Sequence, residues 1–474
     1  MEKLNEWTNT LLKNYKKISE NNKVLIYFYI LILLLCAGFR NNLFQNVATI
    51  ILSLTLVLIL INKFEISDKK FKIICFGIVA LNIILIYWGN YESIKLGFSD
   101  GLVQGQIGEY VYNDTYNYYY GSEGMLYIWK NDFFTWINGD ASKSAYFYGF
   151  YNFYVIWNAI IRVFFGSNLN IMIFLKFQFS IVSIFLMYKV AKKILSDKYS
   201  RGVVIVANIF PGYLLVNISL MRDSLIAFLV LLATYILVMY EECLDKKKTI
   251  YLLVTIILLS YMRIYIGITL ALGLGIYFYF NKINFRECEN IKKLIGFSAI
   301  IFLIVGFIAY FMGYGFLGYD LIFNASTELP RFNAERVNSI GSIVFWTLYH
   351  SFLGGRVFFD YSGYIGNFLN SISNVFIMSI ASLNLFVIFL KRDKVSVRTF
   401  KFILFTFIFS LATAGIVVFT FSSIVPRLYI AWFWSQVIVF FSIFQYLEEN
   451  CKFYKKIIYI YMTYVLVSIV LLLK

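Results

Sequence analysis

Long apolar runs alternate with short polar and basic segments along most of this chain. A helix that crosses a bilayer needs about 20 consecutive, largely apolar residues. The pattern therefore predicts an all-α, polytopic transmembrane helical bundle with about thirteen spans. They are expected at residues 24–38, 43–62, 71–89, 169–188, 202–218, 224–240, 249–262, 264–280, 294–313, 367–390, 402–420, 428–447 and 457–473. Both flanks of 249–280 are basic, so this segment is predicted to be a hairpin that turns at Arg263.

The composition supports a membrane environment. Apolar residues make up 60% of the chain and charged residues 14%, with a mean hydropathy of +0.73. Soluble domains average about 45–50% apolar and about 25% charged residues. A net charge of +16 would suggest nucleic acid as the partner of a soluble protein. In a membrane protein the positions of the charges matter more than the net charge. Membrane lipid is therefore the expected partner, and nucleic acid is not.

The basic residues predict the orientation of the chain. About 29 of the 42 Lys and Arg residues fall in the segments that are inside when the N-terminus is cytoplasmic. These segments are 1–23, 63–72, 189–201, 241–248, 281–293, 391–401 and 448–456. Cytoplasmic loops collect Lys and Arg, so we predict a multi-pass protein of the inner cell membrane with a cytoplasmic N-terminus. The polar first 23 residues lack a signal-peptide cleavage site, and the first span is expected to remain as an anchor.

Two long segments are predicted on the outer side. Residues 90–168 are rich in Tyr, Trp, Asp and Glu, and residues 314–366 contain a short apolar stretch expected to lie at the membrane interface. The chain is accordingly divided into an N-terminal segment with two extra spans (1–70), a transmembrane core with the large outer loop (71–313), and a C-terminal part (314–474).

Several soluble-enzyme chemistries are poorly matched by this sequence. It contains no P-loop, and its single histidine, His350, argues against a histidine zinc site or a Ser-His-Asp triad. No metal ligands are assigned. A loosely held divalent cation such as Mg²⁺ or Mn²⁺, on carboxylates and a lipid phosphate, stays open as a cofactor.

The richest candidate for chemistry is the stretch from Asn113 to Tyr120, just inside the large outer loop. Asp114 could take a proton from an acceptor hydroxyl or amine as a general base. Tyr118 and its aromatic neighbours could stack on sugar faces. The alternative is that these tyrosines form the aromatic belt found at any membrane interface.

From residue 71 to about 280 the chain resembles the GT-C membrane glycosyltransferases, such as the lipid A aminoarabinose transferases and protein O-mannosyltransferases. In that family an acidic residue after a span precedes a Tyr-containing helix, an aromatic helix and a span with a basic end. The matching pieces here are Asp114 with Tyr118, Asn131–Thr135, Tyr151–Trp157, Phe164–Gly166, Tyr188–Leu195 and Met221–Phe228.

The resemblance implies transfer of a sugar from a polyprenyl-phosphate or pyrophosphate donor to a lipid, glycan or protein acceptor at the outer face. Asp114 would deprotonate the acceptor, and the alternative bases are Glu109, Glu123, Asp132, Asp140 and Asp223. The leaving phosphate requires positive charge, and the planar fork of arginine suits it. The candidates for binding the donor are Tyr118, Arg222, Asp223, Arg263, Arg336 and Arg427. Two alternatives remain open: a polysaccharide polymerase of the O-antigen type, and a flippase or transporter of lipid-linked oligosaccharide.

Overall fold

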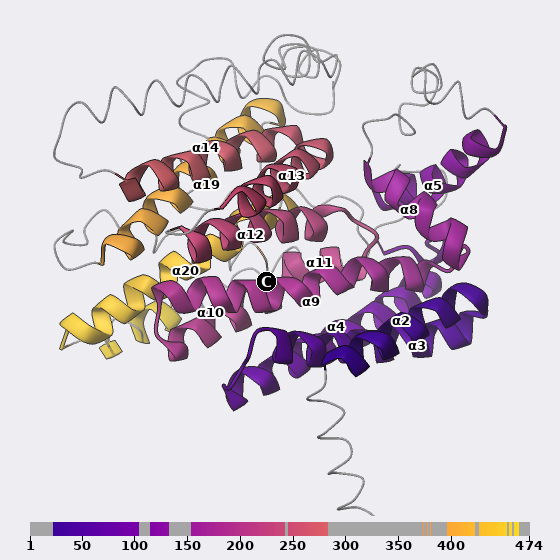
Figure 1. Cartoon of the computed structure of the whole chain (residues 1–474), viewed down its shortest axis with the longest axis horizontal. Coiled ribbons are helices and arrows are strands. Elements are labelled where there is room, and N and C mark those ends of the chain that lie inside the picture. The colour runs from indigo at the N-terminus through magenta and orange to yellow at the C-terminus, as the bar shows by residue number, and fades with distance from the viewer. Residues whose placement is uncertain are drawn as a thin grey trace, which may run out of the picture. The chain divides into compact units, whose positions relative to one another are not determined.

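The computed structural model shows a helical protein that falls into two compact units (Figure 1). It describes residues 22–103, 114–131, 153–241, 245–282, 373, 377, 380, 396–421, 426–452, 455–456 and 459–463. None of these residues forms a strand, which confirms the all-α class. The first unit comprises the described residues up to Phe185 together with Leu214–Leu225, and most of the remaining described residues form the second unit.

Six of the described helices are long and apolar enough to cross a membrane. They are α3 (Asn42–Lys63), α4 (Lys69–Lys95), α9 (Leu169–Ile194), α12 (Asp223–Tyr240), α19 (Val397–Phe421) and α20 (Pro426–Asn450). A seventh span is formed if α10 (Asp197–Ile209) and α11 (Pro211–Ile218), which meet at a 55° bend, are taken as one. Pro211 accounts for the bend, because proline lacks the N–H that would continue the α10 ladder.

The prediction of thirteen spans is therefore not confirmed. The helices at the first predicted span and at 249–262, α2 (Asn22–Gly38) and α13 (Lys246–Met262), have only 17 residues each. The partner of α13, α14 (Ile264–Lys282), begins directly after the predicted break at Arg263, whose extended backbone ends α13. Three further predicted spans, 294–313, 367–390 and 457–473, lie largely outside the described residues.

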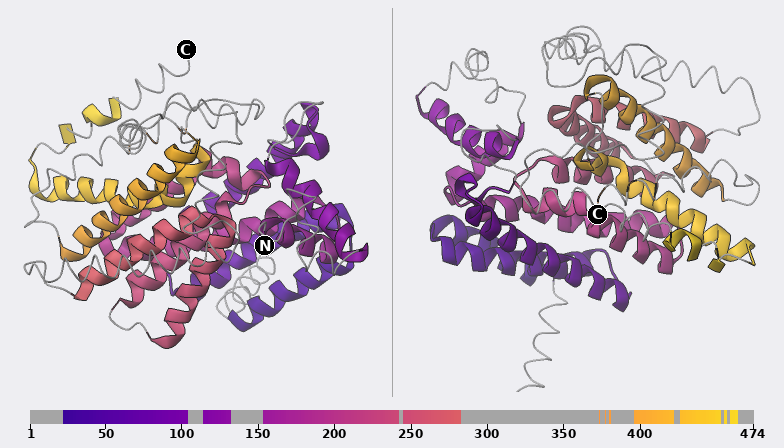
Figure 2. Two further views of the ribbon diagram at one scale, coloured as in Figure 1. Left: turned by 90° about the horizontal axis from the view of Figure 1, so that it is seen from above. Right: turned by 180° about the vertical axis from the view of Figure 1, so that it is seen from behind.

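The first unit is built around α2, α3 and α4, which run side by side in Figures 1 and 2. Hydrogen bonds between polar side chains join helices within this unit. Gln178 on α9 donates to the Ser53 hydroxyl on α3 at 2.9 Å, and Asn217 donates to the Asn82 carbonyl oxygen on α4 at 3.1 Å. Such bonds join helices in lipid, where apolar contact alone gives little driving force. On their other faces α2–α4 expose large apolar side chains such as Leu34, Ile73 and Ile84.

Two shorter helices complete the first unit. They are α5 (Asp114–Asn131) and α8 (Phe153–Phe165), which pack against each other and derive from the predicted outer loop. A short turn, η1 (Ser99–Gly101), precedes them at the end of α4, where Asn90 donates to the Gly101 carbonyl at 3.0 Å.

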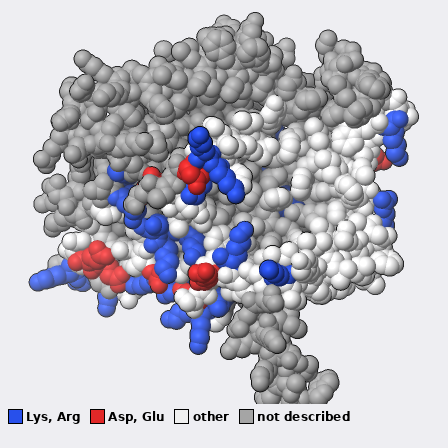
Figure 3. All heavy atoms as spheres, viewed as in Figure 1, with Lys and Arg blue, Asp and Glu red and all other residues white. Residues whose placement is uncertain are grey.

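The second unit contains a partly buried ion pair and aromatic packing. The carboxylate of Glu241 accepts hydrogen bonds from Arg398 at 2.8 and 3.0 Å and from the Tyr277 hydroxyl at 2.9 Å. Phe210 and Phe433 stack with their ring centroids 3.9 Å apart. In Figure 3, Lys and Arg gather at the lower left, over α10 and α20 of this unit.

Candidate functional site at the start of helix α12

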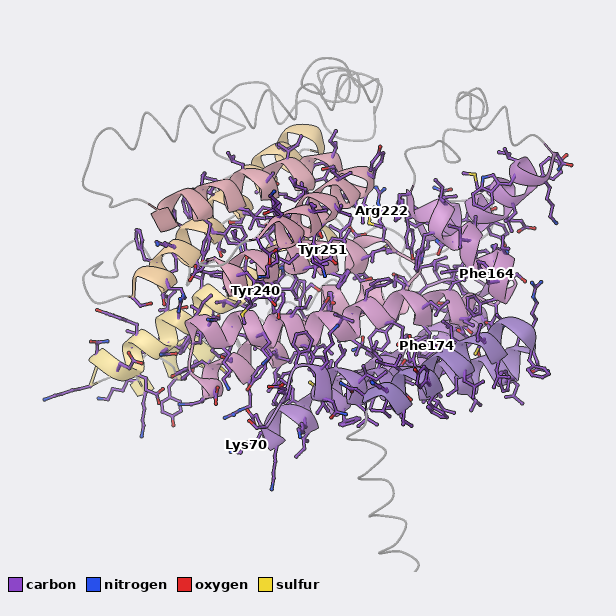
Figure 4. All side chains as sticks on the ribbon, in the orientation of Figure 1. Lys70, Phe164, Phe174, Arg222, Tyr240 and Tyr251 are labelled. Atoms are coloured by element: carbon purple, nitrogen blue, oxygen red, sulfur yellow. The ribbon has the colours of Figure 1, made fainter. Side chains whose placement is uncertain are left out.

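The tyrosines of α5 meet the start of α12 within the first unit. The Tyr118 ring lies edge-on to the Tyr154 ring of α8, with centroids 4.9 Å apart, and the Arg222 guanidinium lies 5.7 Å from the Tyr118 centroid. Figure 4 shows Arg222 on the side of the chain where α8 lies. Asp114 precedes Tyr118 by one helical turn, so both residues occupy the same face of α5. Three residues predicted from the sequence, Asp114, Tyr118 and Arg222, thus share one region.

A buried charge lies beside this region. Lys176 on α9 is fully buried, and its ammonium group donates to the backbone carbonyls of Val216 and Ser219. Val216 lies in the last turn of α11 and Ser219 directly after it, where carbonyls have no partner within the helix. In lipid each such group must be satisfied within the protein. Lys176 therefore caps a helix that ends inside the bundle, and its positive charge suits that end of the helix dipole.

Asp223 provides the opposite charge. It is the first residue of α12 and is 3% exposed. A carboxylate in the first turn of a helix is stabilised by the N-terminal end of the dipole. Asp223 also acts electrostatically on Lys176 and on Tyr154. The break between α11 and α12 is thus lined by a cation at one helix end and a carboxylate at the other.

Several buried polar atoms around this break lack a hydrogen bond to the described protein groups. They are the hydroxyls of Ser219 and Ser224 and Nε of Arg222. A buried polar group without a partner costs about 1–3 kcal/mol, and native proteins contain few of them. Three such side chains within residues 219–224 offer hydrogen-bonding groups to water or to a polar ligand.

Arg162 is a functional candidate that the sequence reasoning counted only as a loop charge. On α8 it is 7% exposed, and it donates to the Ser122 hydroxyl at 2.7 Å and to the Tyr119 carbonyl at 3.0 Å. Its guanidinium also lies 4.1 Å from the Tyr119 ring centroid. Burial raises the pKa of the Tyr119 hydroxyl, and the positive charge of Arg162 opposes this shift. Arg162 fixes α5 on α8 and so positions Tyr118. The feature of the sequence that could have indicated this role is an arginine within the apolar run 153–165.

The remaining predicted arginines are not part of this region as described. Arg263 is 8% exposed and lies at the α13–α14 break in the second unit. There α13 and α14 approach so closely that a Cβ on Gly267 would meet the Ser260 hydroxyl at 2.1 Å. The side chain of Arg427, near the start of α20, and all of Arg336 lie outside the described residues, as does His350.

The fold defines an α-helical protein with several helices that are long and apolar enough to span a membrane. Within the described ranges, no three His, Cys, Asp or Glu side chains lie close enough together to hold a metal ion. No protein-family model, no curated protein and no solved structure matches the chain.

Proposed function

We propose that this chain is a membrane glycosyltransferase that moves a sugar from a polyprenyl-phosphate or pyrophosphate donor to a lipid, glycan or protein acceptor. The observation that carries the proposal is the position of Arg222. Its guanidinium lies 5.7 Å from the centroid of the Tyr118 ring, and its buried Nε has no hydrogen bond to the described protein groups. Asp114 lies on the same face of α5 as Tyr118. An arginine whose Nε lacks a hydrogen-bond partner and whose guanidinium lies beside an aromatic ring suits a sugar phosphate, since its fork binds phosphate oxygens in pairs.

The chemistry assigns one role to each group. Asp114 takes the proton from the acceptor hydroxyl or amine as the acceptor atom attacks the anomeric carbon. The bond from that carbon to the phosphate oxygen breaks, and Arg222 stabilises the negative charge on the leaving phosphate. A divalent cation such as Mg²⁺ or Mn²⁺ stays part of the proposal as a partner of the donor phosphate. Because the described carboxylates do not gather into a metal-binding group, we assign no step to it.

The proposed orientation places the N-terminus in the cytoplasm of an inner membrane. In the first unit the turn between α3 and α4 carries Lys63, Lys69, Lys70 and Lys72, and Figure 4 shows Lys70 projecting away from the ribbon there. α4 then leads to segments of mixed charge, with Glu92, Asp100, Asp114 and Glu123 beside Lys95, Lys130 and Arg162. The four lysines of the α3–α4 turn support a cytoplasmic position of that turn and therefore an outward-facing α5.

The transporter alternative has one observation in its favour, the buried charges Lys176 and Asp223, because ionisable groups inside a membrane often mark transport pathways. The carbonyls that Lys176 caps give this charge a structural role instead. A polymerase of the O-antigen type would use the same donor chemistry. Its product, a long polymer, would distinguish it from a transferase.

The test compares purified protein in lipid nanodiscs, using radiolabelled hexoses on synthetic polyprenyl phosphate as donors. Asp114→Asn keeps the shape of the side chain and removes the base, so turnover should fall by about 10²–10⁴-fold with donor binding unchanged. Glu123→Gln is the matched control on the same helix, because the Glu123 side chain is 66% exposed.

Three outcomes would contradict the assignment. Normal transfer by Asp114→Asn with loss in Asp223→Asn would move the base to Asp223. Repeated transfer that builds a long polymer would identify a polymerase. Movement of intact donor across the bilayer without any new glycosidic bond would identify a transporter.

A further inference from the structure

A second group of tyrosines lies on the opposite face of α5 from Tyr118. Residues two apart in a helix differ by about 200° around its axis, so Tyr116 and Tyr120 both point away from the side of Tyr118. Their ring centroids are 4.4 Å apart, with 43° between the ring planes. The Tyr120 hydroxyl donates to the Asp100 carboxylate. We call Tyr116, Tyr120 and Asp100 the tyrosine platform.

The platform rests on a rigid support. Tyr119 packs edge-on to Tyr120 with centroids 5.2 Å apart, and its own hydroxyl donates to the Ser167 carbonyl at 2.9 Å. Tyr119 is buried and in contact with Arg162, whereas Tyr116 and Tyr120 are half-buried. Tyr116 and Tyr120 therefore keep part of their surface exposed, while buried Tyr119 supports Tyr120.

The backbone conformation of Asp100 is unusual. Its φ of 54° lies in the left-handed region, which costs a non-glycine residue energy although Asp tolerates it better than most. The turn is held by the Asn90 hydrogen bond to the Gly101 carbonyl and by the Gly101 amide, which donates to the Phe98 carbonyl at 3.1 Å. Strained residues of this kind concentrate at functional sites, where the surrounding structure maintains them. Here the strained turn presents an exposed carboxylate to the tyrosines.

Aromatic rings beside a carboxylate match the chemistry of a saccharide. The C–H face of a sugar ring packs on an aromatic face, and sugar hydroxyls donate to a carboxylate. The groups that act electrostatically on Tyr119 are the Arg162 guanidinium, which is buried, and the carboxylates of Asp100 and Glu123, which are exposed. The exposed charges beside the platform are therefore negative. An anionic sugar would be repelled, so neutral sugars or amino sugars fit this surface.

We propose that the tyrosine platform binds the glycan chain of the acceptor at neutral or amino-sugar units away from the reacting end. The description of that glycan as an acceptor rests on the proposed transferase function. Because the platform and Asp114 lie on opposite faces of α5, they are separated by about one helix diameter, roughly 10–12 Å with side chains. A monosaccharide or a short lipid acceptor cannot contact both, whereas an oligosaccharide can. The acceptor is accordingly a glycan of several units.

The first experiment measures binding without any reaction. Full-length protein in nanodiscs is titrated with neutral di-, tetra- and hexasaccharides of hexose and N-acetylhexosamine, followed by saturation-transfer NMR. Affinity should rise with chain length, and Tyr116→Ala should weaken hexasaccharide binding by about tenfold or more. Tyr120→Phe keeps the ring and removes the hydrogen bond to Asp100, so it should give a smaller loss. Tyr127→Ala, on the same helix and 70% exposed, is the control and should bind as wild type does.

The second experiment uses transfer assays with the same acceptors. Tyr116→Ala should raise the acceptor KM for long glycans and leave kcat unchanged, because the base and the donor site are intact. Loss of binding in Tyr116→Ala with no transferase activity in any variant would overturn the proposed function and uphold the platform. Equal hexasaccharide affinity in wild type and Tyr116→Ala, or no oligosaccharide binding to the wild type, would overturn the platform.

Discussion

Replacing Lys176 with methionine tests whether the buried charge in α9 is structural. The methionine keeps much of the volume but leaves the Val216 and Ser219 carbonyls without their donor, and it removes the positive charge that interacts electrostatically with buried Asp223. Hydrogen bonds to charged groups contribute about 1.5–3 kcal/mol each, and removing one partner of a buried pair costs about 3–5 kcal/mol. These figures describe overlapping contacts, so we expect Lys176→Met to lower the free energy of unfolding by about 3–5 kcal/mol.

The assay is reversible unfolding in mixed detergent micelles. Lys192→Met on the same helix is the control, since Lys192 pairs with Asp197 at 3.0 Å while its side chain is 46% exposed. Exposed pairs contribute at most about 1 kcal/mol. Adding Asp223→Asn to Lys176→Met should restore part of the loss, because the second change removes a buried negative charge that has lost its attraction to Lys176.

If Lys176→Met unfolds at the same free energy as Lys192→Met, the capping argument is wrong. The carbonyls after α11 would then have other partners, and the buried charge would favour the transporter alternative instead.

Three further predictions address the first unit and the orientation of the chain. Cysteines placed at Ser142 and Lys247 should react with impermeant reagents from opposite sides of the membrane, and labelling from the same side would contradict the proposed topology. Arg162→Met should release α5 from α8, giving faster hydrogen exchange in α5 and a loss of about 3–5 kcal/mol, whereas Lys130→Met on α5 should have little effect. Burial and the hydrogen bond to Asp100 raise the pKa of Tyr120, so the contribution of this hydroxyl to stability should be lost as pH rises beyond the ordinary tyrosine pKa of about 10. Tyr120→Phe should therefore reduce the loss of stability in alkaline solution, and an unchanged alkaline profile would refute this assignment.

Much of the local structure follows from the sequence. Apolar runs such as 43–62 and 169–188 gave helices close to the predicted bounds, because a helix in lipid satisfies all its backbone groups within itself. The break at Arg263 was likewise predicted, since basic flanks require both ends of 249–280 to lie on one side. The count of thirteen spans was not confirmed, because α2 and α13 have only 17 residues each and three predicted spans lie largely outside the described residues.

The candidate site depended on contacts between distant parts of the chain. The sequence indicated Asp114, Tyr118 and Arg222 separately, but only the packing of α5, α8 and α12 brings Tyr118 and Arg222 together. Lys176 looked like an isolated charge within a span, and only the end of α11 beside it explains its burial. Hydrophobic periodicity is a property of neighbouring residues, so it determines which segments become helices. Which side chains meet across those helices depends on tertiary packing, because it brings together groups that are far apart in sequence.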